Sequence, residues 1–320
     1  MSGIRVAVPV ERLPGSTPLY MDFVARADSA VHRRLGGFRG DAEAWRAWWE
    51  DPEALTYYFI GKDNITYHTI FWPAVLMAYG GLNLPTDVPA NQFVTFKGDR
   101  ASKSRGVGES VAGYIERYQA DAIRYGLAAN LPEQSDTDLT EAELIRRNND
   151  ELVATWGNLV NRVLSMTFRT FAGKVPEPGA YDQRDERLIV HGQVMLDAVA
   201  EQIEGVRLKG ALSTAMAHAQ EANAYLNETE PWKTAKSDLA RTATSLYVAL
   251  CAIAALKVAL YPYLPFSSQQ IHEYMGLPGD VTEAGWTRRD PVPGTSLREP
   301  APLFKKLDVP DAAEEPLLSA

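Results

Sequence analysis

Cysteine is nearly absent from this chain: Cys251 is the single one in 320 residues. One cysteine excludes an internal disulfide framework and any zinc knuckle built from several thiolates. No apolar run reaches the roughly 18–20 residues of a membrane span, since Lys257 interrupts Leu246–Leu260. Met1–Gly15 has no hydrophobic signal region. We therefore expect a cytoplasmic protein that engages no membrane, with Cys251 as a small buried side chain.

Positive charge is also in short supply, because 32 Lys and Arg stand against 41 Asp and Glu, for a net charge of −9. This balance argues against bulk, non-specific binding of nucleic acid, although it leaves room for a local RNA site. The length and the 46% hydrophobic content are ordinary for one large or two smaller globular domains.

One stretch, Gly98–Gly108, is basic against this acidic background. Its three glycines flank the cations and hydroxyls of Arg100, Ser102, Lys103, Ser104 and Arg105. Glycine lets the backbone approach a ligand closely. Cations, hydroxyls and free backbone N–H groups suit a polyanion such as a triphosphate. By composition alone, a solvated basic loop is the competing interpretation.

An α/β unit is predicted before this stretch. Tyr57–Ile60 has the pattern of a buried strand that ends at Gly61, and residues 67–79 have helical periodicity. In such units ligands bind beyond the carboxyl ends of the strands, near the starts of helices. A second strand, Phe93–Phe96, leads into the basic stretch in the same way.

Three polar or aromatic residues, Asp63, His68 and Trp72, fall at the predicted ligand-binding end of this unit. His68 and Trp72 are four residues apart, so they share one helix face. A satisfied core histidine beside a core tryptophan is the alternative.

From Thr140 the chain is almost wholly helical. Thr140 and Glu143 have capping-box spacing, and the predicted helix runs to Phe171. Further helices are expected near residues 184–204, 208–226 and 231–260, with a short one ending near 274. Short connections between them predict a four- or five-helix bundle, wrapped by a proline-containing tail.

Several stretches together resemble the methionyl-tRNA synthetases, a class I family. Residues 100–104, Arg-Ala-Ser-Lys-Ser, resemble the family signature Lys-Met-Ser-Lys-Ser. Other stretches are similar to the segment around the methionine pocket, to the bundle and to the tail of the family: 59–74, 146–162, 230–233, 265–269 and 302–306. The resemblance covers nearly all of residues 57–308.

The resemblance implies α/β plus all-α architecture: the second half of a Rossmann-type nucleotide-binding domain followed by an α-helical anticodon-binding bundle. The expected parts are a partial catalytic domain at 1–135, the anticodon-binding domain at 136–277 and a tail at 278–320. The implied activity is methionine–tRNA ligation, in which ATP with Mg²⁺ activates methionine for transfer to tRNA(Met). No zinc or other metal site is expected.

Carried over by position, Lys103 would stabilise the triphosphate, while Ser102 and Ser104 support the loop. A positioned cation is most valuable where charge develops on the leaving pyrophosphate. Asp63 would act in catalysis and in the amino-acid pocket, and Gly61 would join Asp63 and Lys103 in ATP binding.

The resemblance also assigns His68 and Trp72 to the methionine pocket, and Asn158, Arg162 and Trp232 to recognition of the CAU anticodon. These residue types suit RNA, because splayed loop bases stack on aromatic and guanidinium planes and hydrogen-bond through their edges.

The chain also departs from the family pattern. None of its histidines are paired at the spacing of the His-Ile-Gly-His-type motif that binds ATP. In the pocket strand, Asp22 replaces a tryptophan and Val24 an aspartate; Arg100 and Ala101 replace the first Lys-Met of the signature. We therefore expect catalysis to need a first Rossmann half from a separate chain. The alternatives are a non-catalytic tRNA-binding paralogue, or an amino-acid-activating synthetase-like protein of secondary metabolism.

Overall fold

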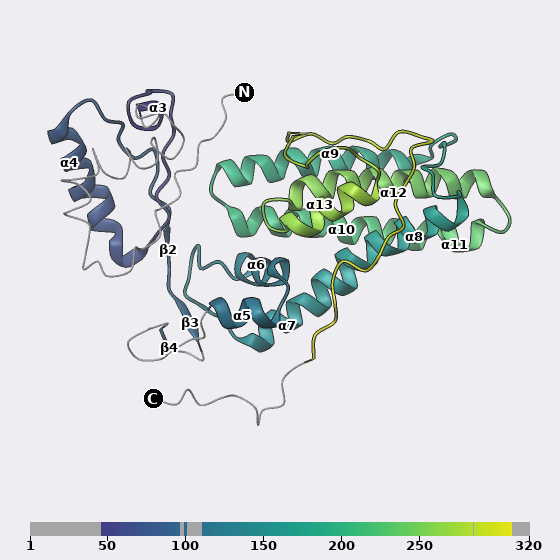
Figure 1. The fold of residues 1–320 in the computed structure, drawn as a ribbon, viewed down its shortest axis with the longest axis horizontal. Coiled ribbons are helices and arrows are strands. Elements are labelled where there is room, and N and C mark those ends of the chain that lie inside the picture. The colour runs from purple at the N-terminus through teal and green to yellow at the C-terminus, as the bar shows by residue number, and fades with distance from the viewer. Residues whose placement is uncertain (1–45, 97–98, 101–110, 284, 309–320) are drawn as a thin grey trace. The chain divides into compact units, whose positions relative to one another are not determined.

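The computed structural model describes residues 46–96, 99–100, 111–283 and 285–308. The pocket-strand residues 20–25 and the signature-loop residues 101–104 lie outside these ranges. The chain divides into two compact units, one within Met1–Phe93 and Glu133–Ser135, the other within Val94–Pro132 and Asp136–Ala320. Figure 1 shows the elements of each unit.

The first unit contains a parallel βαβ arrangement. Strand β1 (Ile60–Gly61) pairs in parallel with β2 (Ala90–Asn91), and the connection between them holds the helical elements. These are the 3-10 turn η2 (Lys62–Asn64), the π-helix η3 (Tyr67–Phe71) and α4 (Trp72–Tyr79), and α3 (Arg46–Trp49) precedes β1. The predicted order of strand, polar turn and helix is thus present.

The predicted strand Tyr57–Ile60 is wrong in extent and in burial. Pairing is limited to an isolated bridge between Tyr57 and Asp87 and to the two-residue strand β1, and Phe59 is 44% exposed. Pro89 lies between the two pairings, and because proline has no backbone N–H it interrupts the ladder.

The second unit opens with a small sheet of order β4-β3-β5. Strand β3 (Val94–Phe96) pairs antiparallel with β4 (Asp99–Arg100) and parallel with β5 (Thr137–Asp138). The strand predicted at Phe93–Phe96 is therefore confirmed to within one residue. Helices α5 (Val111–Arg117) and α6 (Ala120–Ala129) follow β4.

The compact units divide the chain at a different place from the predicted boundary at residue 135, because α6 belongs with the bundle. Arg124 donates from Nε to the carbonyl of Tyr263 at 3.0 Å, and Asp121 accepts from the backbone N–H of Ser267 at 2.7 Å. Tyr125 on the same helix is only 1% exposed. These contacts join α6 to the start of the last bundle helix.

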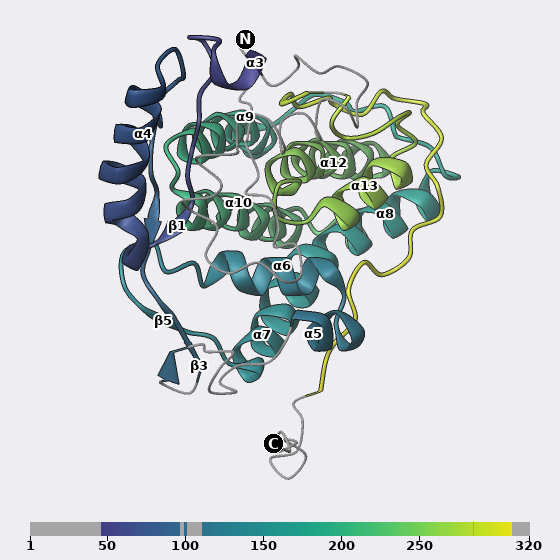
Figure 2. The ribbon, with the colours of Figure 1, turned by 60° about the vertical axis from the view of Figure 1, so that its left-hand side comes forward.

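The bundle contains the long helices that the sequence predicts. In chain order its elements are α7 (Glu141–Arg147), the π-helix η5 (Asn148–Gly157), α8 (Asn158–Thr170), α9 (Gln183–Glu204), α10 (Leu208–Thr229), α11 (Pro231–Thr234), α12 (Leu239–Leu260) and α13 (Pro265–Tyr274). Figure 2 shows α9, α10 and α12 packed side by side. The helix predicted over residues 231–260 is two helices, because Asp238 caps a new start by accepting from the N–H of Arg241.

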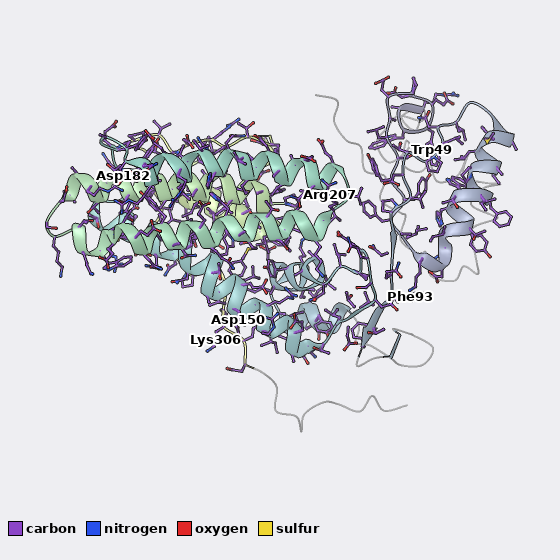
Figure 3. The ribbon with its side chains drawn as sticks, turned by 180° about the vertical axis from the view of Figure 1, so that it is seen from behind. Trp49, Phe93, Asp150, Asp182, Arg207 and Lys306 are labelled. Atoms are coloured by element: carbon purple, nitrogen blue, oxygen red, sulfur yellow. The ribbon has the colours of Figure 1, made fainter. Side chains whose placement is uncertain are left out.

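Local sequence explains where the other helices begin. The Thr140 side chain accepts from the N–H of Glu143 at the start of α7. Asp182 and Asp185 form a capping box at the start of α9, which satisfies backbone N–H groups that have no partner within the helix. Figure 3 shows Asp182 at one end of α9 and Arg207, just beyond its other end.

Helix α12 is the centre of the bundle core. It is long and apolar enough to cross a membrane by composition, but 94% of its most apolar window is buried inside the protein. Leu246, Leu250 and Ile253 are fully buried. A helix that is apolar on all sides is stable in water when neighbouring elements cover it on every side. The segment after α13 then runs along the bundle and buries Leu303 and Phe304.

Candidate functional sites

The signature-loop residues Ser102, Lys103 and Ser104 lie outside the described residues, so their catalytic roles stay predictions. Strand β4, which ends at Arg100, is described and leads directly into them. The loop therefore begins at the end of a paired strand.

In the first unit, the predicted pocket residues His68 and Trp72 converge on Tyr58. The Trp72 indole N–H donates to the Tyr58 hydroxyl at 3.0 Å, and the His68 ring lies 5.8 Å from the Tyr58 ring. The Trp49 ring meets Trp72 edge-on at 5.9 Å. These four rings make an aromatic cluster. His68 and Trp72 were predicted as site residues from the sequence, whereas Tyr58 and Trp49, which come from other segments, were not.

Protonation in this cluster follows from burial. The His68 side chain is buried, and its Nδ1 lies 3.0 Å from the carbonyl oxygen of Asn64. Because a carbonyl only accepts, His68 Nδ1 carries the proton. Burial raises the pKa of Tyr58, which the hydrogen bond from Trp72 partly opposes. The Tyr58 phenol therefore stays neutral and keeps its proton as a donor.

Gly61 and Asp63 are brought together at the end of β1. A Cβ atom at Gly61 would lie 2.8 Å from Asp63 Oδ1, so a side chain there would displace the carboxylate. Asp63 Oδ1 accepts from the Asn64 side chain at 3.2 Å. Between them, Lys62 donates from Nζ to the Gln92 side chain at 2.8 Å. The turn after β1 thus presents the carboxylate of Asp63 next to the Gly61 backbone.

In the second unit, all three predicted anticodon residues meet at one place. The Arg162 guanidinium lies over the Trp232 ring, 5.0 Å from its centroid, and the ring is 39% exposed. Asn158 and Arg162 both line a cavity of about 390 Å³. Arg162 Nη2 also donates to Asn227 Oδ1 at 3.4 Å.

The backbone around Trp232 explains its position. Glu230 adopts a left-handed conformation, with φ 41° and ψ 55°, so the chain reverses between α10 and α11. Pro231 occupies the first turn of α11, where a missing N–H costs no hydrogen bond. The Lys233 backbone N–H donates to the Glu230 carbonyl at 2.8 Å. This tight reversal holds Trp232 beside the end of α10.

The opposite wall of the cavity comes from α10, a helix that was predicted from the sequence but not as part of the site. The lining residues are Ala154, Thr155, Asn158 and Arg162 from η5 and α8, and Gln220, Asn223, Ala224 and Asn227 from α10. Gln220, Asn223 and Asn227 recur at helical spacing, so they share one face. That row of amides is visible in the sequence, but it is equally typical of a solvated helix face.

Within the described residues, no group of three or more His, Cys, Asp or Glu side chains could hold a metal ion. Cys251 is buried, as predicted, and burial raises the pKa of its thiol. The thiol is therefore inert as a nucleophile.

Two family models match the chain. Residues 22–164 match the class I tRNA synthetases (M), and residues 175–315 match the anticodon-binding domain of methionyl tRNA ligase. The fold, a partial α/β unit followed by a helical bundle with an arginine–tryptophan stack, is accordingly that of a class I aminoacyl-tRNA synthetase.

Comparison with individual proteins narrows the class. The methionine–tRNA ligase of Roseiflexus sp. (strain RS-1) is 47% identical over 307 residues, covering 86% of this chain and 52% of that protein. The Corynebacterium jeikeium (strain K411) enzyme is 41% identical, covering 86% of this chain and 54% of its own length. The chain spans about half the length of the curated relatives it matches.

Solved structures of methionyl-tRNA synthetases are also similar to this chain. The Mycobacterium tuberculosis methionyl-tRNA synthetase bound by methionyl-adenylate is 28% identical, with a TM-score of 0.73 over 79% of this chain and 50% of that one. Its apo form is 27% identical, with a TM-score of 0.72 over 81% of this chain and 51% of that one. The chain belongs to the methionyl-tRNA synthetase family.

Proposed function

We propose that this chain binds tRNA(Met) through its anticodon and serves methionine–tRNA ligation in the cytoplasm. The observation that carries the proposal is the stack of Arg162 on the half-exposed Trp232, beside the cavity between α8 and α10. Such a stack is a platform for a splayed RNA base. None of the lining residues is acidic, although the chain as a whole is. The cavity is therefore electrostatically suited to RNA.

Trp232→Ala tests the platform. We expect tRNA(Met) affinity to fall by ~1–3 kcal/mol, the typical loss when a base–aromatic stack is removed. Fluorescence anisotropy with labelled tRNA(Met) measures it. Trp286→Ala is the matched control, because Trp286 is 37% exposed, against 39% for Trp232, and its N–H donates to the Leu196 carbonyl away from the cavity. Equal affinities for both variants and the unmodified protein would contradict the anticodon assignment.

We propose that the first unit takes part in the activation of methionine. The aromatic cluster of Trp49, Tyr58, His68 and Trp72 offers apolar ring faces beside the polar groups of Tyr58 and His68, which suits a thioether side chain. Asp63 follows β1 where ligands of α/β units bind. ATP would bring Mg²⁺ with its phosphates, because that ion is usually held by one or two carboxylates plus substrate phosphates. Lys103 would face the same phosphates.

We further propose that this reaction needs a first Rossmann half in addition to residues 1–320. ATP–pyrophosphate exchange, measured for the chain alone and with a candidate partner, tests the idea. Exchange is expected only in the mixture, and Lys103→Ala should abolish it there. Exchange by the chain alone would remove the need for a partner. Tight tRNA binding without exchange in any mixture would favour the non-catalytic paralogue.

A further inference from the structure

Near the end of its described part, the tail of the chain is fastened to the π-helix η5 by two asparagines. Asn149 Nδ2 donates to the Leu307 carbonyl at 2.8 Å, and Asn149 Oδ1 accepts from the Leu307 backbone N–H at 2.9 Å. Asn148 Nδ2 donates to the Lys305 carbonyl at 2.9 Å. Asn149 thus satisfies both polar backbone groups of Leu307, as a neighbouring strand would.

An aromatic ring of the same tail packs at the other end of η5. Phe304 is 6% exposed, and a Cβ atom built at Gly157 would lie 3.2 Å from its Cδ2. The same Cβ atom would lie 2.9 Å from the Leu152 carbonyl oxygen, so a side chain at this position would displace the backbone of η5. The tail therefore contacts η5 at both ends, near Asn149 and at Gly157.

Contacts from outside matter for η5 because of the kind of helix it is. A π-helix closes its hydrogen bonds over five residues, is rare, and occurs mostly as a single turn within an α-helix. The π-helix here extends over 10 residues. Because a π-helical turn holds more residues than an α-helical turn, relaxation of η5 to an α-helix would rotate α8 about its axis relative to α7. The tail contacts at both ends of η5 oppose that rotation.

Another part of η5 forms a wall of the cavity between α8 and α10. Ala154 and Thr155 line this cavity. The Thr155 carbonyl accepts from Asn223 Nδ2 at 3.1 Å, which joins η5 to α10. Asn158, a further lining residue, begins α8 directly after η5 ends. One helical element thus carries the tail at its two ends and part of the cavity wall in its second half.

We propose that Asn149 and Phe304 are positioning residues of the RNA site. By holding the tail against η5 they keep its π-helical form, and this form sets the rotation of α8 at which Asn158 and Arg162 line the cavity. Neither Asn149 nor Phe304 lines the cavity itself. The inference rests on the proposed function, because it concerns how the proposed RNA site is held in place.

Asn149→Ala in the full chain tests this role. Hydrogen exchange read by mass spectrometry should show faster exchange of the backbone amides of residues 148–157, because the tail is held less firmly on η5. Loss of two hydrogen bonds weakens the docking of the tail by about 10-fold or more. The affinity for tRNA(Met), measured by fluorescence anisotropy, should therefore fall by about 3- to 10-fold.

Two further variants complete the test. Phe304→Leu removes the aromatic ring and keeps an apolar side chain, which provides a milder release of the tail if Asn149→Ala lowers the thermal unfolding temperature below the assay temperature. It should likewise speed exchange in residues 148–157 and weaken tRNA(Met) binding. Arg298→Ala is the matched control, because Arg298 also belongs to the tail but donates to Glu273 of α13, at 3.2 Å. It should leave both quantities unchanged.

The possible results separate this inference from the proposed function. An unchanged tRNA(Met) affinity in a folded Asn149→Ala or Phe304→Leu overturns the inference and leaves the proposed function standing. Exchange that stays slow in residues 148–157 of both variants overturns it too, as does an equal loss of affinity in Arg298→Ala. Failure of the unmodified protein to bind tRNA(Met) overturns the proposed function, whatever the tail variants do to exchange in η5.

Discussion

Lys257 is a charged side chain buried in the bundle core, and Lys257→Met should stabilise the protein near neutral pH. The side chain is 3% exposed in the last turn of α12, and Nζ lies 2.9 Å from His272 Nδ1. His272 Nε2 lies 3.0 Å from the Pro278 carbonyl and must donate to it, so Nδ1 accepts from the lysine. The partner of this cation is a neutral ring rather than a carboxylate.

The magnitude follows from the pKa. Burial, aided by the charge of Arg289, lowers the pKa of Lys257 from 10.5 to about 8. A difference of that size corresponds to ~3 kcal/mol of lost preference for the charged form. Methionine has a similar shape and carries no charge, but it leaves His272 Nδ1 without a donor, at a cost of ~1–2 kcal/mol. The variant should therefore be ~1–2 kcal/mol more stable near neutral pH.

The pH dependence gives the sharper test. Between about pH 8 and pH 10.5 the unfolded chain holds a proton on Lys257 that the folded chain has lost, so this residue makes stability rise with pH in that window. Urea unfolding at about pH 7 and about pH 9.5 should show the advantage of Lys257→Met shrinking toward zero. Tyrosines titrating in the same range contribute equally to both proteins and cancel. Leu256→Met, a neighbouring buried swap without a charge, should show a difference independent of pH. A constant advantage for Lys257→Met would refute the reasoning.

Two further substitutions probe the bundle. Asp185 is fully buried and accepts from Arg241 at 2.6 and 2.7 Å. Asp185→Asn should cost ~3–5 kcal/mol, because Arg241 would keep only its longer ion pair with Asp182, at 3.6 Å. A loss below ~1 kcal/mol in urea unfolding would show that water screens this pair, as at the surface. Leu250→Ala should cost ~2–5 kcal/mol, because the fully buried side chain lies in α12 and its removal leaves a cavity. Calorimetry measures that loss, and Leu239→Ala, at a 53% exposed position of the same helix, should change stability little.

Helix boundaries were predictable where the signal is local. The cap at Thr140, the strand at Val94–Phe96 and the end of α9 at Glu204 depend on a few neighbouring residues. The break between α11 and α12 was missed, although Asp238 followed by an apolar run is a cap signal. The strand at Tyr57–Ile60 was overestimated, because its length depends on Pro89, a residue about thirty positions away.

Each candidate site likewise contains residues that could be predicted from the sequence and residues that could not. Asn158, Arg162 and Trp232 could be assigned by likeness to a family, and the structure brings them to one cavity. The amides of α10 that complete the cavity could not be assigned, because a row of amides on one helix face is equally typical of a solvated surface. In the first unit, Tyr58 was counted only as part of a strand, yet its hydroxyl accepts the N–H of Trp72.

The amino-acid sequence by itself determined the family, the order of α/β unit and helical bundle, and the residues carried over by motif, because these depend on local pattern and spacing. Only the tertiary structure decided which helix faces which. Packing of α10 against η5 places the Thr155 carbonyl within reach of Asn223, and this contact turns an ambiguous amide into an oriented acceptor. Hydrogen-bond direction depends on partners far apart in the chain, so no local pattern could have specified it.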